Sequence, residues 1–175
     1  MTHSEFREVF HSNKDLLFRF AYRMTGSRAA SEDVVQECFL ALWRKPAAYD
    51  SARGPLRAFL FGIARNLVLK RLRDERPHEP LEPDTFICSP IDLVGVERSD
   101  AVAQAVQMLP ALQREALILA EYEELPLEEI ARVTLAEVGA VKSRLHRARE
   151  NLRRMLAPLL EPEKLQPKGT LYGTK

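Results

Sequence analysis

Apolar residues recur at intervals of three and four along most of the chain, which is the spacing of α-helices that bury one face. Alternation with a period of two, which would indicate strands, is almost absent. Turn residues and prolines divide the periodic stretches into separate helices. We expect these helices to cover residues 6–24, 27–45, 59–76, 101–109, 111–122, 125–133 and 141–157.

The N-terminal helices have clear local signals. Gly26 is a residue type that ends helices and Ser27 one that caps the next, so the first helix should stop and the second should start there. The third helix follows a loop, and its apolar spacing predicts that Phe59, Ile63 and Leu67 point inward.

A proline-rich, acidic stretch separates the helices into two groups. Residues 77–97 contain four prolines and little periodicity, which is typical of a linker rather than of a packed element. The sequence therefore predicts an all-α chain with two small helical domains, residues 1–76 and 98–160, joined by this linker. Residues 161–175 are expected to form a flexible tail.

The formal net charge is only +1, but the charges are strongly segregated. Nine basic and three acidic residues lie between Arg44 and Arg76, and residues 141–154 carry six basic residues and one acidic residue. Acidic residues outnumber basic ones in the stretch between them. Two basic segments separated by an acidic one suit a ligand that the chain touches in two places.

Several functional classes find no support in the composition. No apolar run approaches the roughly 18 residues of a membrane span, and the amphipathic N-terminus contains acids, unlike a signal peptide. Cys38 and Cys88 lie far apart with no CxxC pair, and the four histidines are scattered. We therefore predict a cytoplasmic protein without a metal, a cofactor or an enzymatic activity.

The stretch VKSRLHRARENLRR, residues 141–154, allows three interpretations: a solvated helix face, a membrane-surface helix or a surface that binds DNA. Its apolar stripe lacks Trp and Phe, which disfavours the membrane. The short helix predicted at LEEIARV, residues 127–133, lies just before it. This order is typical of a helix-turn-helix, whose second helix enters the major groove of DNA.

With these residues in view, the chain resembles bacterial RNA polymerase sigma factors of the extracytoplasmic-function (ECF) class. EEIARVTLAEVGAVKSRLHRARENLRRML is similar to the family's fourth conserved region, which recognises the −35 promoter element. SEDVVQECFLALWRK and SARGPLRAFLFGIARNLVLKRLR are similar to the second region, which binds the polymerase clamp and opens the −10 element. The resemblance implies as partners core RNA polymerase, double-stranded promoter DNA, the single-stranded −10 non-template strand and an anti-sigma factor.

The resemblance also implies which residues contact these partners. Core polymerase would bind one face of the helix at DVVQE, through Asp33, Gln36 and Glu37. The −10 element would contact a loop and the helix that follows it, through Tyr49, Asp50, Arg53, Gly54, Arg57, Arg65, Asn66, Lys70 and Arg73. The −35 element would contact the basic helix, through Lys142, Ser143, Arg144, His146, Arg147 and Arg149.

Three positions around the helix-turn-helix depart from the family's pattern. The family commonly has a glycine in the turn, a proline two residues later and then a threonine, where this chain has Leu135, Glu137 and Ala140. A leucine in a left-handed turn costs roughly 1 kcal/mol or more relative to glycine. Because Thr134 and Glu137 match a capping box, we expect Thr134 to cap the recognition helix, which would then start early.

Two other functions stay open. A sigma mimic would have this fold but would sequester an anti-sigma factor without touching DNA, and it would have little use for two basic segments. A polymerase-independent helix-turn-helix regulator would not need the DVVQE face or the −10 residues. The resemblance therefore favours a sigma factor over both.

Overall fold

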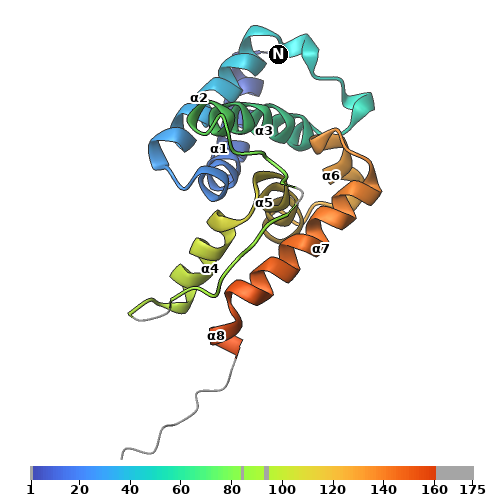
Figure 1. Ribbon diagram of the computed structural model, residues 1–175. Helices are drawn as coiled ribbons and strands as arrows, with labels where there is room; N and C mark the ends of the chain where they lie inside the picture. The colour runs from blue at the N-terminus through green and yellow to red at the C-terminus, as the bar shows by residue number, and fades with distance from the viewer. Residues whose placement is uncertain (1, 84, 93–94, 161–175) are drawn as a thin grey trace, which may run out of the picture.

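The computed structural model describes residues 2–83, 85–92 and 95–160, and the regular structure in that part of the chain is helical. The N-terminal group comprises α1 (His3–Thr25), α2 (Arg28–Arg44), two 3₁₀ turns, η1 (Pro46–Ala48) and η2 (Ser51–Arg53), and α3 (Leu56–Glu75). The C-terminal group comprises α4 (Arg98–Met108), α5 (Ala111–Leu117), its π-helical continuation η3 (Ile118–Tyr122), α6 (Leu127–Thr134), α7 (Val138–Met155) and α8 (Ala157–Leu160) (Figure 1). The prediction of an all-α fold is confirmed.

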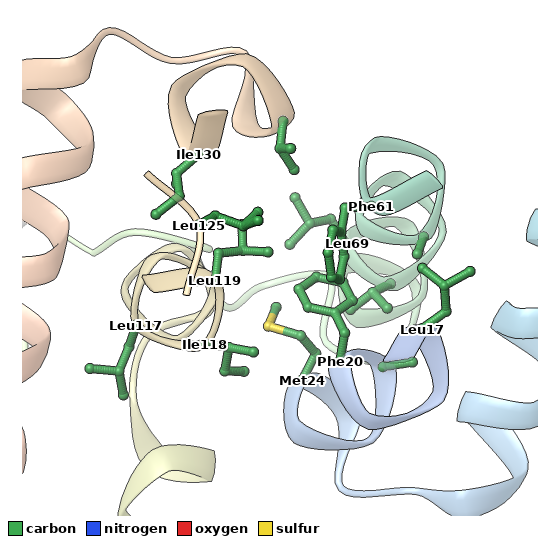
Figure 2. Packing of buried hydrophobic residues seen from close by; sticks show 14 of the residues in the cluster. Leu17, Phe20, Met24, Phe61, Leu69, Leu117, Ile118, Leu119, Leu125 and Ile130 are labelled. Atoms are coloured by element: carbon green, nitrogen blue, oxygen red, sulfur yellow. The ribbon is translucent and has the colours of Figure 1, made fainter. Parts of the chain in front are cut away.

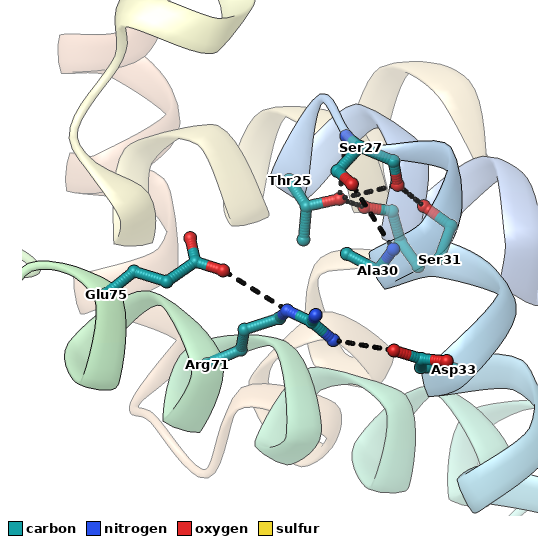
Figure 3. Close-up of polar contacts among 8 residues, drawn as sticks. Thr25, Ser27, Ala30, Ser31, Asp33, Arg71 and Glu75 are labelled. Carbon is teal, nitrogen blue, oxygen red and sulfur yellow. Dashed lines mark hydrogen bonds and ion pairs between the residues drawn. The ribbon is translucent and has the colours of Figure 1, made fainter.

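The turn between α1 and α2 is built by the two residues that local sequence rules single out. Gly26 ends α1 in the left-handed conformation, with φ 69°, where glycine has no steric cost. The Ser27 hydroxyl accepts a hydrogen bond from the Ala30 amide at 3.2 Å, and the Ser27 carbonyl accepts one from the Ser31 hydroxyl at 2.7 Å (Figure 3). The predicted boundary between the first two helices is confirmed.

One hydrophobic core runs through both groups of helices. Phe20 and Met24 of α1 and Phe61 of α3 are fully buried, and they belong to the same cluster as Ile118 and Leu119 of η3. Figure 2 shows these residues on facing elements, with Met24 between the N-terminal helices and η3. Because burial of apolar surface is the dominant favourable term in folding, this shared core holds the two groups together.

Helix α3 buries a different face from the one that its spacing predicts. Leu60, Phe61 and Val68 are fully buried, whereas Phe59 and Ile63 are only partly buried. The reason is that α3 packs against α1 and α2 and also against α6 of the other group. A helix that is apolar around much of its circumference has no single stripe, so spacing alone cannot identify its inner face.

The segment between the two groups is packed, and the expectation of an unpacked linker is corrected. Leu81, Cys88 and Ile91 are partly buried against the core. The Leu81 carbonyl accepts a hydrogen bond from the Leu112 amide at 3.1 Å, and the Ile91 amide donates one to the Met155 carbonyl at 2.9 Å. Prolines prevent a helix here, but the apolar residues between them still bury their side chains. The segment forms a strap (residues 77–83 and 85–92) along α5 and α7 (Figure 1).

Candidate nucleic-acid interface

Helices α6 and α7 form a helix-turn-helix whose turn is made by Leu135. This residue has φ 52° and ψ 41°, a left-handed conformation, and it is 83% exposed. The Ala136 amide donates to the Ala131 carbonyl at 3.0 Å, which closes the turn. Ile130 of α6 and Val141 of α7 are buried in the core that the two helices share. Because α7 is held along this apolar stripe, its opposite surface faces outward.

Thr134 does not cap the recognition helix, so that prediction is wrong. Thr134 is the last residue of α6, and its buried hydroxyl donates to the Ile130 carbonyl at 2.8 Å. Helix α7 starts at Val138, with Glu137 at the N-cap position. The chain therefore keeps a glycine-type turn with a leucine in it, at a cost of roughly 1 kcal/mol.

The six residues of α7 that were assigned to the −35 element lie on two flanks of its outer surface. The helical repeat places three residues on each flank: Ser143, Arg144 and Arg147 on one, Lys142, His146 and Arg149 on the other. Arg144 is partly buried and the other five are exposed. Such a surface offers hydrogen-bond donors both to phosphates and to base edges.

Carboxylates of the same chain neutralise part of this surface. Glu82 of the strap lies with its Oε2 3.0 Å from Nη2 of Arg144, and it also pairs with Arg147. Arg149 pairs with Glu121 of η3. Lys142 and His146 are exposed on the flank that carries Arg149. The outer surface of α7 is therefore basic, with acidic residues placed at both of its edges.

The loop between α2 and α3 encloses a cavity of about 440 Å³. The Tyr49 hydroxyl donates to the Gly54 carbonyl at 3.3 Å, and the Asp50 carboxylate accepts from the Ala52 amide at 2.9 Å, so two bonds hold the loop. Gly54 has φ 143°, a conformation that other residues rarely adopt. Both helical groups contribute to the lining, which includes Tyr49, Asp50, Arg53, Gly54, Phe59, Asn66, Arg132, Val133 and Leu135.

Two arginines of α3 that were assigned to the −10 element are engaged by the C-terminal group. Arg65 pairs with Glu115 of α5, whose side chain is 1% exposed. Arg57 Nη2 donates to the Glu123 carbonyl at 2.7 Å and lies 3.4 Å from its carboxylate. Burial raises the pKa of Glu115, and the hydrogen bond from Arg65 opposes that rise. The other α3 residues assigned to this element are exposed: Asn66, Lys70 and Arg73.

The α2 residues assigned to core polymerase form an exposed face. Asp33, Gln36 and Glu37 are all exposed, on the side of α2 away from the core. Asp33 lies 3.3 Å from Arg71, which also pairs with Glu75 at 3.2 Å (Figure 3). Next to this face, α1 and α2 form an open apolar groove of about 570 Å³, which sequence reasoning does not identify. Its lining includes Phe6, Phe10, Gln36, Phe39 and Trp43.

Sequence reasoning also misses the carboxylates that hold the arginines. Glu82, Glu115 and Glu123 all come from the acidic stretch between the two basic segments. The opposite sign of the neighbouring stretches is the one signal that points to them. It does not say which glutamate meets which arginine, because the partners lie far apart along the chain.

Metal-binding clusters, disulfide bonds and membrane-crossing helices are not found among the residues that the structure describes. Among those residues, no group of three or more His, Cys, Asp or Glu side chains could hold a metal ion. Both cysteines are free, with Cys38 buried and Cys88 partly buried. No described helix has the length and apolar character to cross a membrane.

Known proteins match both helical groups. Residues 9–78 match Sigma-70 region 2, and residues 99–152 match Sigma-70, region 4. The chain is 29% identical over 169 residues to the ECF RNA polymerase sigma factor SigW of Bacillus subtilis (strain 168), covering 88% of this chain and 90% of the relative. It is 32% identical over 158 residues to the ECF RNA polymerase sigma factor SigL of Mycobacterium tuberculosis (strain ATCC 25618 / H37Rv), covering 87% and 89%.

Two solved structures are similar over nearly nine-tenths of the chain, which includes both helical groups. The sigma factor RpoE, solved with the anti-sigma factor NepR from Bartonella quintana, matches with a TM-score of 0.69 at 26% identity, covering 87% of this chain and 97% of that one. CnrH, solved with the cytosolic domain of CnrY, matches with a TM-score of 0.67 at 26% identity, covering 90% of each chain. The two family regions in their order, together with relatives that match over most of their length, show that this chain belongs to the ECF RNA polymerase sigma factors.

Proposed function

We propose that this sigma factor binds core RNA polymerase and directs it to promoters with −35 and −10 elements, where it helps to open the DNA. The observation that carries the proposal is the helix-turn-helix, in which α7 packs by its apolar stripe and turns its cations outward. Each predicted domain has its own binding role in this proposal. Residues 1–76 bind polymerase and the −10 element, and residues 98–160 bind the −35 element. The chain positions the polymerase and performs no covalent step of its own.

On the −35 side, α7 supplies contacts of two kinds. The N-terminal residues of a recognition helix reach base edges, and Lys142 and Ser143 hold such positions. Arg147 and Arg149 lie further along the helix, where they can bind DNA phosphates. A phosphate can accept two parallel N–H hydrogen bonds from one arginine side chain. Each phosphate contact of this kind makes the affinity fall more steeply with salt.

On the −10 side, the cavity beside the α2–α3 loop suits an unpaired base. The rings of Tyr49 and Phe59 lie with their centroids 5.6 Å apart and offer apolar walls. Asn66 can hydrogen-bond a base edge, and Arg53 can bind the adjoining phosphate. The C-terminal group forms part of the wall through Arg132, so a base would enter fully once the two groups have moved apart.

Simultaneous contact with both elements requires the two helical groups to separate. The elements are about 25 base pairs apart, which is roughly 85 Å of duplex at about 3.4 Å per base pair. In the present arrangement α3 and α6 are in direct contact. An extended chain covers about 3.3 Å per residue, so residues 76–97 could span roughly 70 Å and permit the separation.

The exposed face of α2 is the proposed contact with core polymerase, and an anti-sigma factor is the proposed regulator. RpoE is similar over both helical groups and was solved with an anti-sigma factor, which supports a partner of that class here. We infer that these partners meet in the cytoplasm, where Cys38 and Cys88 stay reduced. A sigma mimic is less well supported, because it would have little use for the exposed cations of α7, which include Lys142, Arg147 and Arg149.

Run-off transcription tests the proposal. Purified core polymerase is incubated with a pool of genomic fragments, with and without this chain, and the 5′ ends of the transcripts are sequenced. We expect start sites that depend on the chain and share two sequence elements upstream. If the chain adds no specific start site, while a sigma factor of known promoter does so with the same polymerase, the proposal is wrong.

A charge reversal on α2 tests the polymerase contact. Glu37→Lys should abolish binding to core polymerase, because Glu37 is exposed on the proposed contact face and the fold does not depend on it. Glu8→Lys, an identical change at an exposed position of α1, is the control and should bind normally. Circular dichroism shows whether both variants are folded. Normal polymerase binding by a folded Glu37→Lys variant would rule out this face.

A further inference from the structure

Glu82 is held between two arginines of the recognition helix. Its carboxylate lies 3.1 Å and 3.3 Å from Nε of Arg144 through its two oxygens, and 3.0 Å from Nη2. Its other pairing is with Arg147, one turn further along α7. The side chain of Glu82 is 27% exposed and that of Arg144 16% exposed, so the contact is partly shielded from water. One carboxylate thus occupies two cations that were assigned to the −35 element.

The backbone of the strap presents Glu82 to α7 at a low entropic cost. Prolines stand on both sides, at positions 80 and 83, and a residue that precedes proline is restricted to extended conformations. Leu81 is anchored by the bond between its carbonyl and the Leu112 amide. Since the neighbouring residues are already ordered, little further freedom is lost when Glu82 meets the arginines.

The place that Glu82 takes on α7 is one that a DNA phosphate would take. Glu82 and Pro83 line one surface hollow together with Ala140, Ser143 and Arg144, on the N-terminal half of the recognition helix. The arginine side chain binds carboxylates and phosphates through the same paired N–H groups, so the two anions compete for it. A tethered anion has a high effective concentration, so a free phosphate must displace it rather than simply bind.

We propose that Glu82 is an internal competitor of promoter DNA, which holds Arg144 and Arg147 until the strap is pulled away from α7. The inference rests on the proposed −35 role of α7 and adds a way in which the chain itself regulates that binding. Only Arg76 and residues 77–80 connect the end of α3 to Leu81. Separation of the two helical groups therefore pulls first on the residues that carry Glu82. The recognition helix becomes available when the chain opens to span both promoter elements.

The test compares Glu82→Gln with Glu79→Gln in the full-length chain. Both changes remove one negative charge from the same segment, but Glu79 is exposed and pairs with Arg76, outside α7. The probes are a duplex with the −35 sequence mapped by run-off transcription and a mixed-sequence duplex of the same length. For the free protein, we expect Glu82→Gln to bind the −35 duplex about five- to ten-fold more tightly than wild type at about 0.1 M salt. Glu79→Gln should stay within about two-fold of wild type.

Equal affinities of Glu82→Gln and Glu79→Gln would overturn the proposal. Arg144→Gln and Arg147→Gln, each made in the Glu82→Gln background where the carboxylate no longer holds the arginines, separate this failure from failure of the −35 role itself. If the arginine changes weaken binding in that background and Glu82→Gln alone behaves like its control, only the competitor is excluded. If they leave the affinity of Glu82→Gln unchanged, the −35 assignment fails and the competitor with it. In the polymerase holoenzyme the advantage of Glu82→Gln should disappear, because the strap has already left α7; an undiminished advantage there would contradict release by opening.

Discussion

Helices α3 and α7 both carry more basic than acidic residues but hold them in different surroundings. On α3, Arg65 is 12% exposed and its partner Glu115 is almost fully buried, at the contact between the two helical groups. On α7, Arg149 is 56% exposed, and its partner Glu121 is also accessible to water. The first pair has been removed from solvent and the second has not.

This difference in burial separates an architectural role from a binding role. Removing one partner of a buried pair leaves an uncompensated charge and costs about 3–5 kcal/mol, whereas an exposed pair contributes about 0–1 kcal/mol. Arg65 and Arg57 therefore help to set how the two groups are joined. Arg147 and Arg149 of α7 are exposed and can exchange their carboxylate partners for phosphates at little cost to the fold. The cations of α3 thus support the contact between the two groups, whereas the exposed cations of α7 suit the recognition of DNA that we propose.

The largest expected change in the free energy of unfolding comes from the buried pair of α3. Arg65→Ala should lower the free energy of unfolding by about 3 kcal/mol, because it leaves the charge of Glu115 buried without its partner. Urea denaturation measures the change. Lys70→Ala, an exposed position on the same helix, is the control and should stay within about 0.5 kcal/mol of wild type. Similar losses for the two variants would show that the Arg65 pair is not special.

The pH dependence of stability tests the other partner of the same pair, Glu115. Burial raises the pKa of Glu115 above 4.5, so the folded state favours the protonated carboxyl. Its contribution to stability is fully present below pH 4.5 and is lost as the pH rises through the raised pKa, with a slope of up to about 1.4 kcal/mol per pH unit. Glu115→Gln lacks this contribution. Wild type should therefore lose stability relative to the variant as the pH rises above 4.5, measured by urea denaturation at a series of pH values, and parallel curves would contradict the assignment.

Leu135 lies in the turn before α7, and it also lines the cavity beside the loop between α2 and α3, where the two helical groups meet. Leu135→Gly should raise the free energy of unfolding by about 1 kcal/mol, because glycine adopts the left-handed conformation without steric cost. Leu135→Ala removes the same exposed side chain but keeps the strain, so it should give no such gain. Thermal and urea unfolding of both variants decide the point, and a glycine variant no more stable than the alanine variant would disprove the strain.

The smallest expected change in stability is on α7. Arg149→Gln should alter the free energy of unfolding by less than about 0.5 kcal/mol, since its pair with Glu121 is exposed. It should nevertheless reduce the slope of log affinity against log salt for −35 DNA by about 0.9, the contribution of one phosphate contact. Arg28→Gln, which breaks an exposed pair on α2, is the matched control and should change neither quantity. An unchanged slope for Arg149→Gln would remove this residue from the DNA contact.

Features that depend on neighbouring residues were predictable, and features that depend on packing were less so. The Gly26–Ser27 boundary and the order of α6 and α7 follow from turn residues and apolar spacing. The capping role of Thr134 was not settled by its local match, because its hydroxyl instead bonds the preceding turn of α6. The inner face of α3 and the packing of the strap escaped prediction. Helix α3 packs against α1 and α2 as well as α6, and the strap packs on α5 and α7, so both depend on residues far away in the chain.

The sequence by itself determined the helical fold, the helix-turn-helix and the separation of charge into basic and acidic stretches, because each depends on residues within a few turns of one another. Only the tertiary structure decided which cations are buried and which carboxylates they meet. Arg65 and Glu115 are 50 residues apart in the chain, Arg57 and Glu123 are 66 apart, and Arg144 and Glu82 are 62 apart. The effect of a charge depends on the water and the partners around it, and contacts over such separations exist only after the chain has folded.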